Sequence, residues 1–213
     1  MKIKNIIFDL GGVLLNLDVM RTNAAFAALV GNTEIQQKLF QRLNEEGFWA
    51  NYEIGALDTD EFIERIQNAN PNTITAAQIQ TAWSAMLLDF PKERIEFLRK
   101  LKAQGFKLFL LSNINYIHLR DVYAIVQKQH GLSASEFDAL FDKVYYSHLI
   151  QKRKPDLATY QFVLDDANIN PQETLFFDDL PSNILAAQRC GILAQLHPCN
   201  GDIEKTISQF IQF

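Results

Sequence analysis

Four groups of polar residues end apolar runs in this 213-residue chain. The first is Asp9, which follows the strand-like run of residues 6–8 and stands just before Gly11 and Gly12. A buried aspartate is costly unless its charge is paired, hydrogen-bonded or bound to a metal. Two interpretations of Asp9 stay open from this stretch: an Asx-turn that bonds its own backbone, or a reactive carboxylate at the carboxyl end of a strand.

The second and third groups offer ligands for a phosphoryl group. Ser112 and Asn113 end the run "LFLLSN", where a hydroxyl, an amide and the start of a helix could bind phosphoryl oxygens. The same residue types are also ordinary helix N-caps. Lys154, in "QKRKPD", stands just before a helix that begins near Pro155, so its ammonium could neutralise a transferring phosphoryl group. The alternative is a solvated loop lysine.

The fourth group is the pair Asp178 and Asp179 in "TLFFDDLPSN". Adjacent carboxylates repel each other unless positive charge lies beside or between them. An oxygen-only site of one or two carboxylates suits magnesium, with waters and a substrate phosphate completing its shell. A surface turn with two solvated acids is the alternative, but the apolar run of residues 175–177 favours a position at the end of a buried strand.

The elements that must position these groups follow an alternating pattern. Strand-like apolar runs recur at about residues 3–8, 107–111, 143–147, 174–178 and 192–196. Helical patterns separate them, and such alternation predicts right-handed crossovers onto a parallel sheet. The expected fold class is therefore α/β, with a Rossmann-like parallel sheet at whose carboxyl edge the four polar groups converge.

Residues 16–88 break this alternation, because they contain helical patterns and no convincing strand. We expect them to form an inserted helical cap over the carboxyl end of the first strand, with residues 1–15 and 89–213 as the catalytic core. Such a cap could exclude water and select the substrate. The alternative is a structural appendage.

Composition restricts the class of protein. The net charge is −5 with no basic run, so nothing indicates a nucleic-acid partner. No apolar stretch approaches the length of a membrane span, and the start of the chain lacks the pattern of a signal peptide. Two cysteines, Cys190 and Cys199, predict unpaired thiols and a cytoplasmic protein. The sequence carries no signal for an oligomeric state.

The four groups, in order, resemble the motifs of the haloacid dehalogenase (HAD) superfamily. The matching stretches are "FDLGGVL", "LLSN", "KRKPD" and "FFDDLPSN", and they span most of the chain. Residues 16–88 correspond to that family's cap. Within the family, the sequence is similar to bacterial sugar-phosphate phosphatases of the α-D-glucose-1-phosphate phosphatase kind, through "FDLG", through Asn115 and His118 after "SN", and through the cap stretch "NYEIG".

The resemblance implies a catalytic role for each motif. Asp9 would attack phosphorus and form an aspartyl-phosphate, which water then hydrolyses. Ser112 and Asn113 would hold the phosphoryl oxygens. Lys154 would stabilise the charge on Asp9 and on the phosphate.

The resemblance also implies a magnesium site. Asp9 and Asp179 would bind Mg²⁺ together with the backbone carbonyl of Gly11, and Asp178 would lie in the shell or just outside it. Asn183, where many members carry another acidic residue, would orient Lys154 or a water ligand.

One residue departs from the family pattern. Most phosphatases of this family carry a second aspartate two residues after the nucleophile, which acts as general acid and base, whereas this chain has Gly11. General acid–base catalysis contributes about 10²–10⁴-fold. Three explanations stay open: Asp18, Glu53 or His118 supplies the proton; the leaving group, such as an anomeric sugar hydroxyl, needs little help; or catalysis is vestigial.

The cap stretch "GFWANYEIGALD" is the expected place of substrate contact. Tyr52 could stack on a sugar ring and Glu53 could bond its hydroxyls, with weaker cases for Phe48 and Trp49. The alternative is that these aromatic residues are the core of the cap.

The expected function is a magnesium-dependent phosphatase for small phosphate monoesters, above all sugar phosphates. Its expected partner is therefore a small-molecule phosphate ester, with neither nucleic acid nor membrane. The alternatives are a non-catalytic protein of the same fold that binds phosphorylated metabolites, and a different hydrolase of the HAD type.

Overall fold

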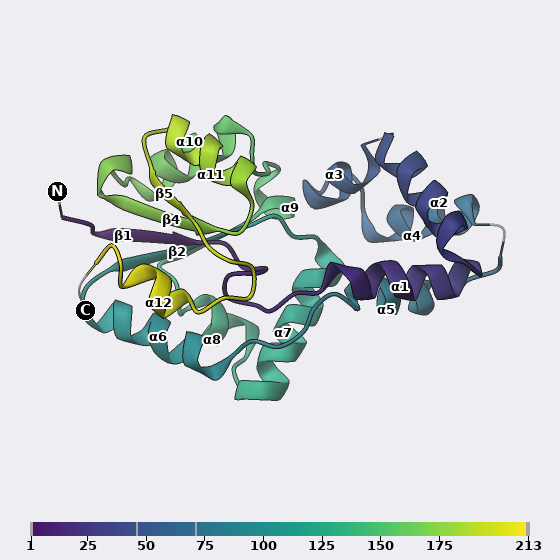
Figure 1. Ribbon diagram of the computed structural model, residues 1–213, viewed down its shortest axis with the longest axis horizontal. Helices are drawn as coiled ribbons and strands as arrows, with labels where there is room; N and C mark the ends of the chain where they lie inside the picture. The colour runs from purple at the N-terminus through teal and green to yellow at the C-terminus, as the bar shows by residue number, and fades with distance from the viewer. Residues whose placement is uncertain (1, 46, 71, 212–213) are drawn as a thin grey trace.

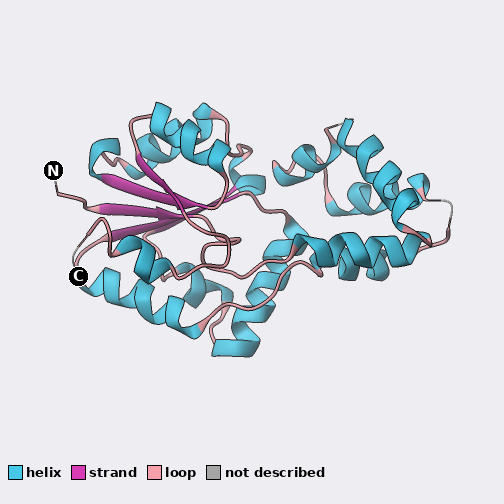
Figure 2. Ribbon diagram, viewed as in Figure 1, coloured by secondary structure: helices cyan, strands magenta, loops and turns pink. Residues whose placement is uncertain are grey.

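The computed structural model describes residues 2–45, 47–70 and 72–211. Its centre is a sheet of strands (Figure 2). The strands are parallel and lie in the order β3-β2-β1-β4-β5. The strands are β1 (Asn5–Phe8), β2 (Lys107–Ser112), β3 (Lys143–Tyr146), β4 (Thr174–Asp178) and β5 (Leu193–Leu196). Each lies within about two residues of a run expected from the sequence, so the predicted α/β class is confirmed.

The strands of the sheet are apolar because both faces are covered, as parallel sheets require. In the central strand β1, residues Ile6, Ile7 and Phe8 are fully buried. Ile6 and Phe8 pack into one hydrophobic cluster and Ile7 into a second cluster on the opposite face. Alternate side chains of a strand point to opposite faces, so one strand serves both cores.

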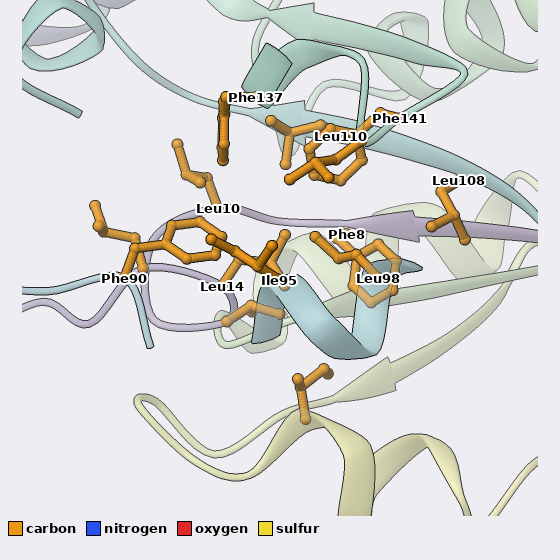
Figure 3. Close-up of a cluster of buried hydrophobic side chains, with 14 of the residues drawn as sticks. Phe8, Leu10, Leu14, Phe90, Ile95, Leu98, Leu108, Leu110, Phe137 and Phe141 are labelled. Atoms are coloured by element: carbon orange, nitrogen blue, oxygen red, sulfur yellow. The ribbon is translucent and has the colours of Figure 1, made fainter. Parts of the chain in front are cut away.

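Helices form a layer on each side of the sheet (Figure 1). One layer holds α6 (Lys92–Ala103), α7 (Tyr116–His130), α8 (Ala134–Asp138) and α12 (Ile203–Ile207). The other holds α10 (Leu157–Ala167) and α11 (Pro181–Arg189), with the short helices α9 (Ser147–Ile150) and η1 (Pro171–Glu173) in the loops nearby. On the side of the first layer, Phe8 of β1 and Leu110 of β2 pack in one cluster with Leu98 of α6 (Figure 3).

A group of helices between β1 and α6 extends from the carboxyl side of the sheet (Figure 1). It holds α1 (Val19–Val30), α2 (Thr33–Glu45), α3 (Phe48–Glu53), α4 (Thr59–Ala69) and α5 (Ala76–Ser84). These helices share their own hydrophobic cluster, centred on Phe62 and Phe48. We call this group the cap. The boundaries at residues 16 and 88 stay predictions, and residues 1, 46, 71, 212 and 213 of the predicted ranges lie outside the described residues.

None of the described helices is long and apolar enough to cross a membrane. Cys190 and Cys199 are both free thiols, as expected. The cytoplasmic location stays a prediction.

Candidate active site

Asp9 follows β1 directly and is only 8% exposed. Its Oδ1 accepts a hydrogen bond of 2.6 Å from the backbone N–H of Leu10 and lies 2.9 Å from the ammonium of Lys154. Burial raises the pKa of Asp9 to about 7, although Lys154 opposes the rise. The bond to Leu10 joins adjacent residues, so it is not the bond of an Asx-turn, which reaches two residues along the chain. The charged partner of Asp9 is Lys154, from the loop before α10.

Lys154 is the cation of the site and is only 1% exposed. Its Nζ lies 2.9 Å from Asp9 and 2.6 Å from Asp178, so one ammonium joins two carboxylates. Burial by itself would lower the pKa of Lys154, but the charges of Asp9 and Asp178 outweigh it and raise that pKa. The alternative of a solvated loop lysine is therefore wrong.

Asn113 positions the lysine through its side chain. The amide Nδ2 donates to the carbonyl of Lys154 at 2.8 Å, and Oδ1 accepts from the backbone N–H of Lys154 at 2.9 Å. These bonds use Oδ1 and one of the two N–H groups of the amide, and Asn113 also lines the cavity described below, so its role in binding phosphoryl oxygens stays a prediction. The buried Ser112 lies at the end of β2 and its side chain lines the cavity described below.

Asp178 is fully buried, and its oxygens have several donors. Besides Lys154, the Nδ2 of Asn183 donates to both oxygens at 2.9 and 3.0 Å, and the backbone N–H of Leu180 donates to Oδ1 at 2.9 Å. Asn183 thus orients Asp178 and, through it, Lys154, which is one of the two roles expected for Asn183. These bonds leave Asp178 little capacity to bind a metal.

Asp179 lines the cavity beside Asp9. Ligand oxygens of Asp9, Asp178 and Asp179 all lie within 4.8 Å of one another. Burial raises the pKa of Asp179. Gly12 makes the close approach possible, because its φ is +75° and a Cβ there would lie 2.5 Å from Oδ2 of Asp179. The clustered oxygens are hard ligands, which fits Mg²⁺.

A cavity of about 340 Å³ opens above these residues and has the size of a small-molecule site. Its floor is the carboxyl edge of the sheet, with Asp9, Ser112 and Lys154. The cap contributes Glu53 and Trp83 to its walls. The four polar groups expected to converge therefore do so, and the cap covers them.

The three acids considered as a substitute for the missing aspartate lie in different places. Asp18 is half-buried, caps the N-terminus of α1 by accepting from the backbone N–H of Met20, and does not line the cavity. His118 lines it, but both ring nitrogens are occupied. Nε2 lies 3.0 Å from the carbonyl of Trp83, and Nδ1 lies 3.2 Å from the amide of Asn115.

The tautomer of His118 follows from these partners. A carbonyl only accepts, so Nε2 carries the proton and Nδ1 accepts from Asn115. Burial lowers the pKa of His118 to about 4, which keeps the ring neutral. The ring joins α7 to α5 and has no proton to give to a substrate.

Glu53 reaches the cavity from the end of α3, where it forms an ion pair with Arg153. Its Oε2 accepts a hydrogen bond of 2.9 Å from Nε of Arg153, and Nη2 of the same guanidinium lies 2.8 Å from Oε2. Burial raises the pKa of Glu53 and the guanidinium counteracts the rise. Sequence reasoning missed Arg153, although its position directly before Lys154 in "KRKPD" was a usable signal.

The aromatic residues of the cap are mostly its core. Tyr52 and Phe48 are fully buried, stack on Phe62 and do not line the cavity. Tyr52 bonds to the hydroxyl of Thr59 instead. The expected substrate contact of Tyr52 is therefore replaced by the alternative, packing within the cap. Trp83 does line the cavity, and nothing in its sequence context indicated this.

Comparison with known proteins identifies the family. The profile described as haloacid dehalogenase-like hydrolase matches residues 3–191. The chain belongs to this hydrolase family. The expected family resemblance is thus confirmed.

Two curated relatives of this HAD-like hydrolase are similar over most of their length. D-ribitol-5-phosphate phosphatase of Bacteroides thetaiotaomicron is 27% identical over 199 residues, which cover 93% of each chain. A sesquiterpene phosphatase of Aspergillus oryzae is 28% identical over 195 residues, which cover 89% of this chain and 87% of the relative.

Solved structures agree with the fold of the HAD-like hydrolase. A HAD family enzyme from Bacteroides thetaiotaomicron superposes with a TM-score of 0.87 at 30% identity, covering 97% of this chain and 99% of that one. The wild-type enzyme in complex with magnesium and inorganic phosphate superposes with a TM-score of 0.78 at 30% identity, covering 96% and 98% of the two chains.

Proposed function

We propose that this protein is a magnesium-dependent phosphatase that hydrolyses small phosphate monoesters through an aspartyl-phosphate on Asp9. The observation that carries the proposal is the buried row Asp9–Lys154–Asp178 at the carboxyl edge of the sheet, with Asp179 beside it and a cavity above. The two phosphatases among the relatives support the reaction class.

The proposed chemistry begins at the carboxylate of Asp9. Lys154 and the Leu10 amide hold Asp9 by Oδ1, which orients the carboxylate toward the cavity. Attack on phosphorus forms the aspartyl-phosphate, and water later hydrolyses it. The ammonium of Lys154 offsets the negative charge of the phosphoryl group, and the hydroxyl of Ser112 donates to a phosphoryl oxygen.

Asp9, Asp179 and the backbone carbonyl of Gly11 would hold Mg²⁺. The bound ion would neutralise charge on the transferring phosphoryl group. Asp178 supports the site through Lys154, because its own oxygens are taken by Lys154, Asn183 and a backbone amide. The magnesium and phosphate in the structure of the Bacteroides thetaiotaomicron enzyme support this assignment.

The identity of the organic group is a separate question. The sequence predicts sugar phosphates, and the relative that acts on D-ribitol 5-phosphate supports that prediction. The sesquiterpene phosphatase supports a different, apolar group. The proposal therefore covers small phosphate monoesters as a class. The side chains that line the cavity determine which organic group fits.

The test is the release of inorganic phosphate from 4-nitrophenyl phosphate, with magnesium and with excess EDTA. Wild-type turnover should require magnesium, and Asp9→Asn should lower kcat/KM by about 10³-fold or more, because the nucleophile is lost. Asp18→Asn is the matched control: it makes the same exchange outside the cavity, keeps a good helix cap and should retain activity.

A second measurement separates an enzyme from a binding protein. Beryllium fluoride with magnesium should raise the melting temperature of the wild type, because a ligand that binds only the folded state stabilises it. A raised melting temperature without Asp9-dependent turnover of any phosphate ester would support the non-catalytic alternative and overturn the proposal.

A further inference from the structure

The place where the family's acid–base residue would stand is filled by an apolar side chain. A Cβ at Gly11 would lie 2.5 Å from Cδ1 of Leu17 and 3.4 Å from its Cγ. Asn200 fixes Leu17 in this position: its side chain accepts from the backbone N–H of Leu17 and donates to its carbonyl, each at 2.8 Å. The space beside the nucleophile therefore holds methyl groups instead of a proton donor.

No other acid that lines the cavity, within the described part of the chain, is free to protonate a leaving group. Asp9 and Asp179 are the proposed metal ligands and are ionised in that role. Glu53 accepts a hydrogen bond from Nε of Arg153 and forms an ion pair with its guanidinium, and both contacts favour the ionised form of Glu53. His118 donates its one proton to a backbone carbonyl, as derived above.

The rest of the cavity lining is largely apolar. It includes Leu15, Leu17, Trp83, Met86, Leu87 and Leu180. Trp83 stacks against Trp49 on one side and against His118 on the other, with 5.0 Å between ring centroids in both pairs. Its indole therefore offers the cavity an edge, and its Nε1 is buried without a partner. Polar side chains in this lining include His118 and the pair of Glu53 and Arg153, which neutralise each other.

We infer that the substrate is a phosphate ester of an acidic hydroxyl on an unsaturated, largely apolar group, that is, of a phenol or an enol. This inference rests on the proposed function and narrows its substrate class. A phenol or enol leaves as a delocalised anion and needs no proton donor. A localised alkoxide without a proton would be far more costly in an apolar cavity.

The group transfer balances without an acid. An oxygen of Asp9 forms a bond to phosphorus as the bond between phosphorus and the ester oxygen breaks. That ester oxygen keeps the electron pair, leaves as a phenolate or enolate and takes its proton from water afterwards. Water then attacks the aspartyl-phosphate, restores the carboxylate of Asp9 and yields inorganic phosphate with loss of a proton to solvent.

A sugar or alditol phosphate fits these walls less well. Its hydroxyls would lose water on entering the cavity, and the apolar wall offers them few partners. A buried hydroxyl without a partner costs about 1–3 kcal/mol. The polyol is also an alcohol of ordinary acidity at most positions, so it would leave without help as a costly alkoxide.

The test is a linear free-energy series. Phenyl phosphates with graded ring substituents vary the acidity of the leaving group at nearly constant shape. Ribitol 5-phosphate and glucose 1-phosphate serve as polyol esters. We expect kcat/KM, which reports the step up to leaving-group release, to fall steeply as the leaving group becomes less acidic. Ribitol 5-phosphate should be at least about 10²-fold poorer than phenyl phosphate, in line with the missing acid, and glucose 1-phosphate, whose anomeric hydroxyl is more acidic, should lie between the two.

A pair of variants restores the acid at its place. Gly11→Asp combined with Leu17→Ala removes the overlap with Leu17 and introduces a carboxyl group, whereas Gly11→Asn with Leu17→Ala has the same shape without an acid. The aspartate variant should flatten the dependence on leaving-group acidity and raise kcat/KM for the least acidic leaving groups by about 10²-fold. The asparagine variant should keep the steep dependence.

The outcomes separate this inference from the proposed function. If no ester shows Asp9-dependent turnover, the proposed function fails and the inference fails with it. If Asp9-dependent turnover exists but wild-type kcat/KM is insensitive to leaving-group acidity, or ribitol 5-phosphate matches phenyl phosphate, only the inference is overturned.

Glu53→Gln adds a check that does not depend on how the double variants fold. An unchanged slope of the series supports the inference, and a steeper slope would identify Glu53 as the acid and overturn it.

Discussion

The floor of the site and the core of the cap are both buried, but different interactions stabilise each of them. In the floor, Lys154 lies between Asp9 and Asp178, and directed hydrogen bonds fill the remaining positions of Asp178. In the cap, the centre is a set of aromatic rings around Phe62, with Tyr52 stacked on it at 4.0 Å. The floor depends on charge and geometry, and the cap depends on apolar area.

This difference explains how each region tolerates change. Hydrophobic burial is non-directional, so many combinations of side chains of suitable volume stabilise such a cap. Buried charges require particular partners at particular distances, because losing one partner leaves another charge without compensation. Variation in the cap can thus change the walls of the cavity while the floor keeps its reaction.

The largest expected effect comes from removing the cation of the floor. Lys154→Met should abolish phosphatase activity and lower the free energy of unfolding by about 3–5 kcal/mol, because Asp9 and Asp178 are left together without a counter-charge. Urea unfolding without magnesium measures the loss. Combining Lys154→Met with Asp178→Asn should recover part of the stability and none of the activity; no recovery would mean that charge repulsion does not explain the loss.

An intermediate effect is expected at the seam between α5 and α7. Because burial lowers the pKa of His118 from 6.5 to about 4, the unfolded chain binds more protons than the folded chain between these values. The contribution of the neutral ring is complete above pH 6.5 and is lost as the pH falls toward 4. The loss amounts to about 3 kcal/mol of unfolding free energy.

His118→Gln isolates this contribution. It removes the titrating group and leaves other pH effects in place, among them the opposite one expected from the raised pKa of Asp9. The wild type should lose about 3 kcal/mol more than the variant when urea unfolding is compared at pH 6.5 and pH 4. Parallel pH profiles of the two proteins would contradict the buried neutral ring.

The smallest expected effect is at the ion pair of Glu53 with Arg153, which joins the cap to the core. Their side chains are 26% and 34% exposed, so water screens the pair in part. A double-mutant cycle with Glu53→Ala and Arg153→Ala should give a coupling energy of about 1 kcal/mol, which should decrease in high salt. A coupling energy of several kcal/mol would show that the pair of Glu53 and Arg153 behaves like the buried charges of the floor and unlike a partly exposed ion pair.

The sequence alone was sufficient for the sheet and for the floor. Parallel strands buried on both faces leave continuous apolar runs, and a functional polar residue at a strand end interrupts such a run visibly. Asp9, Lys154 and the pair Asp178–Asp179 were found in this way. The capping box of Thr75 and Gln78, which opens α5, is likewise a local pattern, because its partners are three residues apart.

Only the tertiary structure decided which partner each side chain has. Asn113 clamps the backbone of Lys154, Asn183 bonds to Asp178, and Leu17 occupies the space beside Gly11, each through contacts that no local pattern encodes. The same holds for the choice between the core of the cap and the wall of the cavity, because an aromatic residue has the same pattern in both places. Local sequence determines strands, caps and the order of motifs, whereas packing between distant segments determines which donor meets which acceptor.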